Sequence, residues 1–444
     1  MEKNLTNGSV FKNLISFSLP FLLSYFLQTL YGMADLLIIG IYNGVDATTA
    51  ISVGSQVMHM ITVMIVGLAM GTTVNIAQAV GSRDKRKTAL FTGNTVTFFA
   101  AVSVALTFVL LLLTRPITSL VSTPAQAVEG TVDYLKICFI GIPFITGYNI
   151  ISSVFRGMGD SKSPMYFIAV ACIVNIALDF LFIGKFGMGA AGAALGTTLS
   201  QTVSVIISLI FIIKKKMIAL SRADFKPKKE IVASIFKIGA PIALQDGLIQ
   251  IAFIVITVIA NRRGLTDAAA VGIVEKIISF VFLVPSSMLS SVSALGAQNI
   301  GAKREDRAVK TLKYAVLISV CFGIAVCVLT QFIAMNAVSL FTKDTAVILA
   351  GSLYLKGYIF DCIFAGIHFS FSGYFCAKGR SELSFIHNII SIAFVRIPAV
   401  YLASKTFKTT LFPMGLATAL GSLVSVIICI IAFRVVQKKS VTRI

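Results

Sequence analysis

Five acidic residues lie inside long apolar segments of this chain, where a charged group is costly to place. They are Asp35, Asp179, Asp246, Glu275 and Asp361. An ionisable group at the depth of a membrane costs at least about 2.5–3.5 kcal/mol unless it faces a cavity or a partner. Acids at such positions are therefore candidates for holding a cation or a proton.

Asp35 and Asp179 have polar neighbours at helical spacing. Gln28, Tyr31 and Asp35 share one helix stripe, and Asn175 lies four residues before Asp179 on one helix face. We place both acids at the same depth, in the outer half of their segments, which allows a shared pocket. Two carboxylates, two amides and a phenol can share a proton or bind Na⁺ through oxygen atoms. The alternative is a pair of buried acids that only tie helices together.

The remaining three acids lie in the second half of the chain. Glu275 is expected in the outer half of its segment, either as a site residue or as the partner of another side chain. Asp246 and Asp361 are expected near mid-depth, where they could line a cavity. Arg396, two residues before Pro398, is a candidate counter-ion for one of these acids.

The elements that carry these residues are predicted to be membrane helices. Of the 444 residues, 57% are hydrophobic and only 13% are charged, whereas a soluble domain carries about 25% charge. A span needs roughly 20 apolar residues, and no period-two pattern suggests strands. The twelve segments that qualify are residues 14–40, 51–80, 90–113, 131–155, 164–184, 190–213, 235–260, 268–297, 314–335, 350–376, 384–404 and 414–434.

The basic residues predict the orientation of these spans. If the N-terminus is inside, 27 of the 38 Lys and Arg residues fall in inner segments and only seven in outer loops. The positive-inside rule therefore predicts that both termini lie inside. The same distribution accounts for the net charge of +20 without a nucleic-acid partner.

The chain also repeats itself at a shift of about 220 residues. Tyr134-Leu135-Lys136 recurs as Tyr354-Leu355-Lys356, and residues 77–81 resemble residues 297–301. We expect an N-terminal six-helix bundle at 1–215, a basic cytoplasmic linker at 216–230 and a C-terminal six-helix bundle at 231–444. Six spans per copy give both copies the same orientation, that is, a parallel pseudo-two-fold repeat, which is typical of transporters.

No motif of an enzyme or of a nucleotide-driven pump is present. The sequence contains no HExxH, no GxSxG and no GxxxxGK[ST]. We therefore expect no enzymatic activity and no cofactor, and we expect an ion gradient to supply the energy.

Several motifs in order along the chain resemble the multidrug and toxic compound extrusion (MATE) family. The matching pieces are residues 28–35 (QTLYGMAD), 156–160 (RGMGD), 175–179 (NIALD) and 189–194 (GAAGAA), the last leading to Thr197. The resemblance covers essentially the whole chain. It implies an all-α membrane protein of twelve helices in two bundles.

The resemblance also implies a cation-coupling site in the first half. Carried over position by position, that site consists of Asp35, Asn175, Asp179 and Thr197, with possible Na⁺ at these four; Tyr31 and Gln28 match nearby positions, and Asn149 would line the same bundle. The second half departs from the pattern, since Asp361 lies about one turn early for the acid of the tenth helix. Either Glu275 takes its place, or the second half serves only substrate binding.

The expected function is export of hydrophobic, mostly cationic drugs or toxins in exchange for H⁺ or Na⁺, by alternating access. Two alternatives remain: a flippase of a lipid-linked precursor, and an exporter of an endogenous metabolite. The expected partners are small hydrophobic cations and membrane lipid, with no nucleic acid. The expected state is a monomer that spans the bacterial cytoplasmic membrane.

Overall fold

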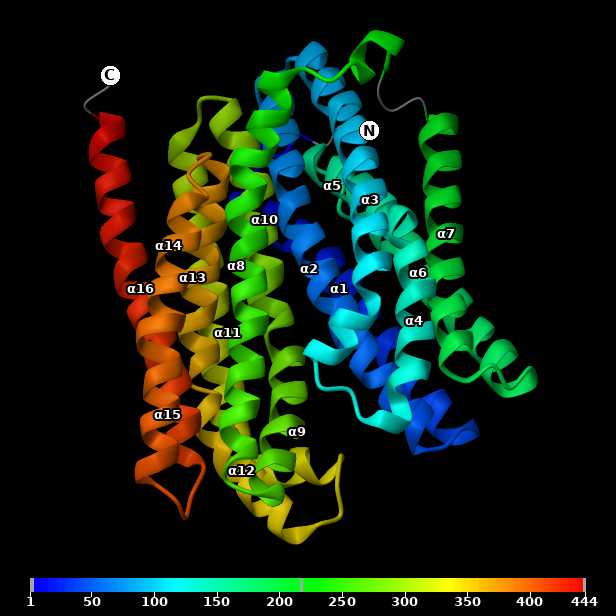
Figure 1. The fold of residues 1–444 in the computed structure, drawn as a ribbon. Coiled ribbons are helices and arrows are strands. Elements are labelled where there is room, and N and C mark those ends of the chain that lie inside the picture. Colours follow the sequence, from blue (N-terminus) through cyan, green and yellow to red (C-terminus); the bar gives the residue numbers. More distant parts are fainter. Residues whose placement is uncertain (1–3, 216–218, 442–444) are drawn as a thin grey trace. The chain divides into compact units, whose positions relative to one another are not determined.

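A computed structural model describes residues 4–215 and 219–441, and within these ranges it contains helices and no strand. Ten helical runs there are long and apolar enough to cross a membrane, and the number rises to twelve when two bent helix pairs are each taken as one span. These runs coincide with the twelve predicted segments. The predicted class, an all-α membrane protein, is confirmed (Figure 1).

The first six spans are built from seven α-helices and a π-helical turn. They are α1 (Val10–Tyr42), α2 (Val45–Gly81), α3 (Lys85–Leu120), α4 (Val128–Ile140) with α5 (Ile142–Gly157), α6 (Lys162–Asp179) with η2 (Phe180–Lys185), and α7 (Gly189–Lys215). A short 3₁₀ turn, η1 (Ala125–Ala127), precedes α4. The neighbouring pairs α6 and α7, and α2 and α5, make the most extensive contacts in this half.

The second six spans follow the same plan. They are α8 (Lys229–Asn261), α9 (Leu265–Val281) with α10 (Leu283–Gly301), α11 (Glu305–Ser339), α12 (Thr345–Tyr358) with α13 (Asp361–Ala377), α14 (Glu382–Ser391) with η4 (Ile392–Arg396) and α15 (Ile397–Thr406), and α16 (Phe412–Val441). Here α13 packs most closely on α10, α11 and α16. The fifth span of each half thus contains a π-helical segment, a feature that is frequent at functional sites.

The fourth span of each half is bent. The axes of α4 and α5 differ by 50°, and those of α12 and α13 by 42°. In the first half, Gly141 lies at the break and Pro143 begins the next helix, where its missing N–H leaves no bond unmade. In the second half, Asp361 begins α13, where a carboxylate interacts favourably with the helix dipole.

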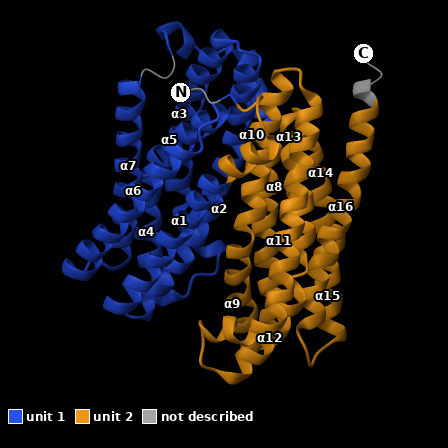
Figure 2. Ribbon diagram, turned by 180° about the vertical axis from the view of Figure 1, so that it is seen from behind, with its two compact units in different colours: residues 1–4, 19–239 blue, residues 5–18, 240–444 orange. Residues whose placement is uncertain are grey.

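The structure divides into two compact units. One unit holds residue 4 and residues 19–239, and the other holds residues 5–18 and 240 onward (Figure 2). The two boundaries that lie inside helices are each beside a proline, Pro20 in α1 and Pro241 in α8. A proline inside a helix removes one backbone hydrogen bond and weakens the helix there. By contacts, residues 5–18 group with the second unit, and the described part of the linker, residues 219–230, groups with the first.

The linker is fastened to α3 by a turn, η3 (Arg222–Phe225). The side-chain amide of Asn94 donates to the carbonyl of Asp224 at 3.0 Å, and Arg86 forms an ion pair with the buried Asp224 carboxylate. The backbone N–H and the hydroxyl of Ser221 also donate to that carboxylate, and these bonds hold its pKa below the usual range. The described part of the linker, residues 219–230, is therefore part of the first unit.

Candidate functional site

The first unit brings Asp35 and Asp179 together from α1 and α6. Both carboxylates are buried, with 3% and 0% exposed surface. The hydroxyl of Thr197 on α7 donates to Asp35 Oδ2 at 3.2 Å. Asn175 and Asp179 also interact with the Asp35 carboxyl group. Three helices that are distant in sequence thus meet at the four residues that the family resemblance implied.

Small residues on α7 make this meeting possible. A side chain at Gly196 would collide with Asp179 Oδ1 and would lie 3.6 Å from Asn175 Nδ2. Ala193 and Ala194 are also fully buried on this helix. Small residues let membrane helices approach closely. The glycine- and alanine-rich start of α7 therefore leaves the room that Asp179 and Asn175 occupy.

The acid pair lacks the partners that buried polar atoms normally have. Asp35 Oδ1, both carboxylate oxygens of Asp179 and both amide atoms of Asn175 make no hydrogen bond, and Gln201 Oε1 makes none either. Among the described residues, no basic side chain forms an ion pair with Asp35 or Asp179. Buried carboxylates without partners are strongly destabilising. This arrangement is suited to a cation or a proton that comes and goes.

The donor set fits either ion. Two carboxylates, an amide oxygen and a hydroxyl are oxygen ligands, the type that hard cations prefer. Two adjacent buried carboxylates can equally share a proton. The side chains of Asp35, Asn175, Asp179 and Thr197 would hold Na⁺; Asp35 and Asp179 would hold H⁺.

The other residues expected in the first half lie around this cluster. Gln201 on α7 donates to the Tyr31 hydroxyl at 3.4 Å, and Tyr31 interacts electrostatically with Asp35. Gln28 interacts with Tyr148 instead. The amide of Asn149 bonds to the carbonyl of Ile145 on its own helix. Gln201 was not expected here, although its spacing of four from Thr197 places both on one face of α7.

The second unit has a different charged cluster. One Arg396 Nη atom donates to Asp361 Oδ2 at 3.0 Å and to the Tyr358 hydroxyl at 2.6 Å. Asp361 is fully buried and Arg396 is 7% exposed. The hydroxyl of Ser422 also interacts with the Asp361 carboxyl group. Arg396 is therefore the counter-ion of Asp361.

Glu275 belongs to the edge of this cluster, and Asp246 does not. Thr257 donates to Glu275 Oε2 at 3.1 Å, while Oε1 has no hydrogen-bond partner. Glu275 also interacts electrostatically with Arg396. Asp246 is half-buried on α8 and has no interacting charged group among the described residues.

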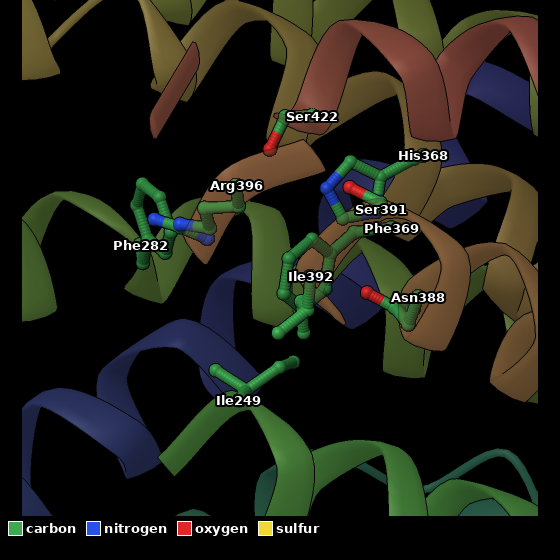
Figure 3. Close-up of a pocket in the computed structure, with 9 residues that line it drawn as sticks. All are labelled: Ile249, Phe282, His368, Phe369, Asn388, Ser391, Ile392, Arg396 and Ser422. Atoms are coloured by element: carbon green, nitrogen blue, oxygen red, sulfur yellow. The ribbon is translucent and has the colours of Figure 1, made fainter. Parts of the chain in front are cut away.

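A small cavity adjoins Arg396, as Figure 3 shows. It has about 20 Å³ of free space, room for about one water molecule. Arg396 and His368 both line it, and Arg396 Nε and His368 Nδ1 lack hydrogen-bond partners. The nine lining residues are Ile249, Phe282, His368, Phe369, Asn388, Ser391, Ile392, Arg396 and Ser422.

Fold and site together define a multi-pass membrane protein that is built from two six-span copies and carries a buried acid pair in the first. The family model MatE matches residues 20–181 and again residues 241–402. The chain therefore belongs to the MatE family, a family of transporters, as the sequence motifs predicted. The two matches are related by a shift of 221 residues at both ends, which agrees with the repeat seen in the sequence.

Named relatives cover nearly the full length of the chain. It is 31% identical over 418 residues to the probable multidrug resistance protein YpnP of Bacillus subtilis, covering 94% of this chain and 93% of the relative. It is 26% identical to the multidrug export protein MepA of Staphylococcus aureus, with the same coverage. Its fold resembles the outward-facing structure of a multidrug resistance MATE family transporter (TM-score 0.92, 22% identity, 99% and 98% of the two chains).

Proposed function

We propose that this protein is a cation-coupled antiporter that exports hydrophobic, mostly cationic drugs or toxins. The observation that carries the proposal is the Asp35–Asp179 pair, which is buried, close and without a basic partner. The names of the relatives, which describe multidrug export and resistance, support the choice of substrate. H⁺ or Na⁺ is the coupling ion.

The mechanism follows from the different needs of the empty and the loaded site. In the empty site, the adjacent carboxylates of Asp35 and Asp179 repel each other and attract a cation or a proton. Once the ion binds, Asp35, Asp179 and Asn175 gain partners, and the packing of α1, α6 and α7 around them becomes tighter. Coupling requires that the ion bind the inward-open and outward-open states with different affinity. Ion binding from outside thus favours release of the drug.

The driving force depends on the charge that is moved. Exchange of one H⁺ or Na⁺ for one monovalent drug cation is electroneutral, so the membrane potential contributes nothing. Each additional positive charge carried inward adds about 2.3 kcal/mol per 100 mV.

The proposed setting is the cytoplasmic membrane of a bacterium, with both termini inside. The excess of Lys and Arg in the segments that would then face the cytoplasm supports this orientation. We propose that the transporter works as a monomer, with small hydrophobic cations as substrates, membrane lipid around it and no cofactor.

The test is ethidium efflux from proteoliposomes under an imposed pH gradient and, separately, under a Na⁺ gradient. Wild type should respond to one of the two gradients, and Asp35→Asn should lose that response. Glu129→Gln makes the same acid-to-amide change at an exposed residue outside both clusters and should retain the response. Full coupling in Asp35→Asn would overturn the site, and failure of both gradients with the wild type would overturn the antiporter.

A further inference from the structure

Arg396 in the second half occupies the position that Asn175 has in the first. The family model places the two copies at a shift of 221 residues, which relates these two residues of the fifth and eleventh spans. The packing agrees with this correspondence, with the glycines of the sixth and twelfth spans 225 residues apart and beyond the matched region. Gly196 on α7 lies against Asn175 and Asp179, and Gly421 on α16 lies against Arg396, where an added Cβ would be 2.8 Å from Arg396 Cβ.

The residue after each glycine also plays a matching part. Thr197 donates to Asp35, and Ser422 interacts with Asp361. Each half therefore has a small hydroxyl residue beside a buried carboxylate. The preceding residue is a glycine, whose missing side chain leaves room for the neighbouring polar group. The two halves differ in what fills that space: an amide in the first and a guanidinium in the second.

Arg396 is surrounded by groups that favour a cation. The acids Asp361 and Glu275 interact with it, as do the phenols of Tyr354 and Tyr358. His368 also interacts electrostatically with it. The guanidinium already takes Asp361 Oδ2 and the Tyr358 oxygen as acceptors. A free cation at the same place would find these ligands occupied and a positive charge beside it.

We propose that Arg396 is a tethered cation that permanently fills, in the second half, the site that a mobile coupling ion fills in the first. The transporter then has one exchangeable cation site, at Asp35 and Asp179, and one fixed site, at Asp361. This inference rests on the proposed coupling function, since it specifies how many ions that function uses.

The test counts the ions bound by purified protein in detergent. The probe is ²²Na⁺ if the Na⁺ gradient drives efflux, and proton uptake read with a pH dye if the pH gradient does. Wild type should bind one ion per chain. Arg396→Asn, which copies the first-half residue, should bind two, and Arg396→Lys, which keeps the charge, should bind one.

A second variant keeps the test decisive if Arg396→Asn does not give a monodisperse protein. Asp361→Asn should still bind one ion per chain, because Asp361 is occupied by Arg396 in the wild type. Loss of the bound ion in Asp361→Asn would overturn the proposal, as would an unchanged count in well-folded Arg396→Asn.

Failure of the underlying coupling site gives a different result. Asp35→Asn should bind no ion, and Asp35→Asn combined with Arg396→Asn should bind one. If Asp35→Asn alone keeps its ion, the proposed function is wrong at Asp35. The comparison of Arg396→Asn with Arg396→Lys still decides whether the arginine fills a cation site.

Discussion

Among the described residues, the cluster in the first half buries Asp35 and Asp179 without a basic partner, whereas the cluster in the second half buries Asp361 together with Arg396. The scaffold around them is the same: a bent fourth span, a π-helical segment in the fifth and a glycine in the sixth. Both clusters contain polar atoms without a hydrogen-bond partner, Asp361 Oδ1 and Arg396 Nε among them, but only the second cluster pairs its acid with a base. The difference teaches that one scaffold can bury acids either without a base, which suits the proposed exchange of a cation, or paired with an arginine, which compensates the charge.

The largest effect should come from giving the first half the residue of the second. Asn175→Arg places a guanidinium beside Asp35 and Asp179, where it fills the proposed ion site permanently. Gradient-driven ethidium efflux should fall to the rate of protein-free liposomes. Asn175→Gln is the control, because it keeps the amide and lengthens the side chain. Efflux at the wild-type rate in well-folded Asn175→Arg would contradict the comparison.

Removal of the arginine from the second half should destabilise the protein. Arg396→Met leaves the fully buried Asp361 carboxylate without its counter-ion, and breaking a buried pair costs about 3–5 kcal/mol. The double variant Arg396→Met, Asp361→Leu removes both charges and should recover most of that free energy of unfolding. Thermal unfolding in detergent measures the stability of the wild type, the single variant and the double variant, and the single variant should be the least stable. Equal stability of the single and double variants would mean that the pair is not the cause.

Removal of one hydroxyl group from each cluster should affect the affinity for the coupling ion differently in the two halves. Thr197→Val removes the hydrogen bond to Asp35, and a bond to a charged group contributes about 1.5–3 kcal/mol. The affinity for the coupling ion should therefore change about tenfold or more. Ser422→Ala removes the equivalent hydroxyl of the second half and should leave the affinity unchanged. Equal effects of the two variants would show that both halves bind the ion.

The smallest effect concerns the linker. Asp224→Asn should lower the melting temperature at pH 7, because the folded protein holds the pKa of Asp224 below its unfolded value of about 3.9. That contribution is present above the unfolded pKa and is lost as the pH falls through the folded pKa. The difference between wild type and variant should therefore shrink below about pH 4. A difference independent of pH would contradict this.

The sequence predicted the spans well and the arrangement at their centres only in part. Hydropathy located all twelve segments, because crossing a membrane requires length and apolarity. It did not predict the bends at Gly141 and Asp361, because a bent helix is as apolar as a straight one. Helical spacing placed Asn175 and Asp179 on one face. Equal depth along the spans allowed a pocket shared by Asp35 and Asp179, but spacing says nothing about which other helix meets them, so Thr197 entered only through the resemblance to a known family.

Two assignments show the same limit in detail. Arg396 was expected near an acid, but only the structure identifies Asp361 as the partner, since the pairing depends on how α13 and η4 are rotated. Gln28 shares the stripe of Asp35 and still interacts with Tyr148, because a stripe on a long helix passes several neighbours. The position of a residue on its own helix thus predicts its interaction partners less well than the contacts between helices do.

The division of α1 and α8 between the units has a consequence for proteolysis. Apart from the step between Asn4 and Leu5, the chain passes from one unit to the other next to Leu19 and next to Gly239, and both of these passages lie inside membrane helices. The linker at its described residues belongs to a single unit, and Gly71 and Gly239 pack against the backbone of Ile235 and Leu68 within it. A protease cut after Leu220 therefore opens a loop without severing either passage, so the nicked protein should migrate as one particle until it is denatured.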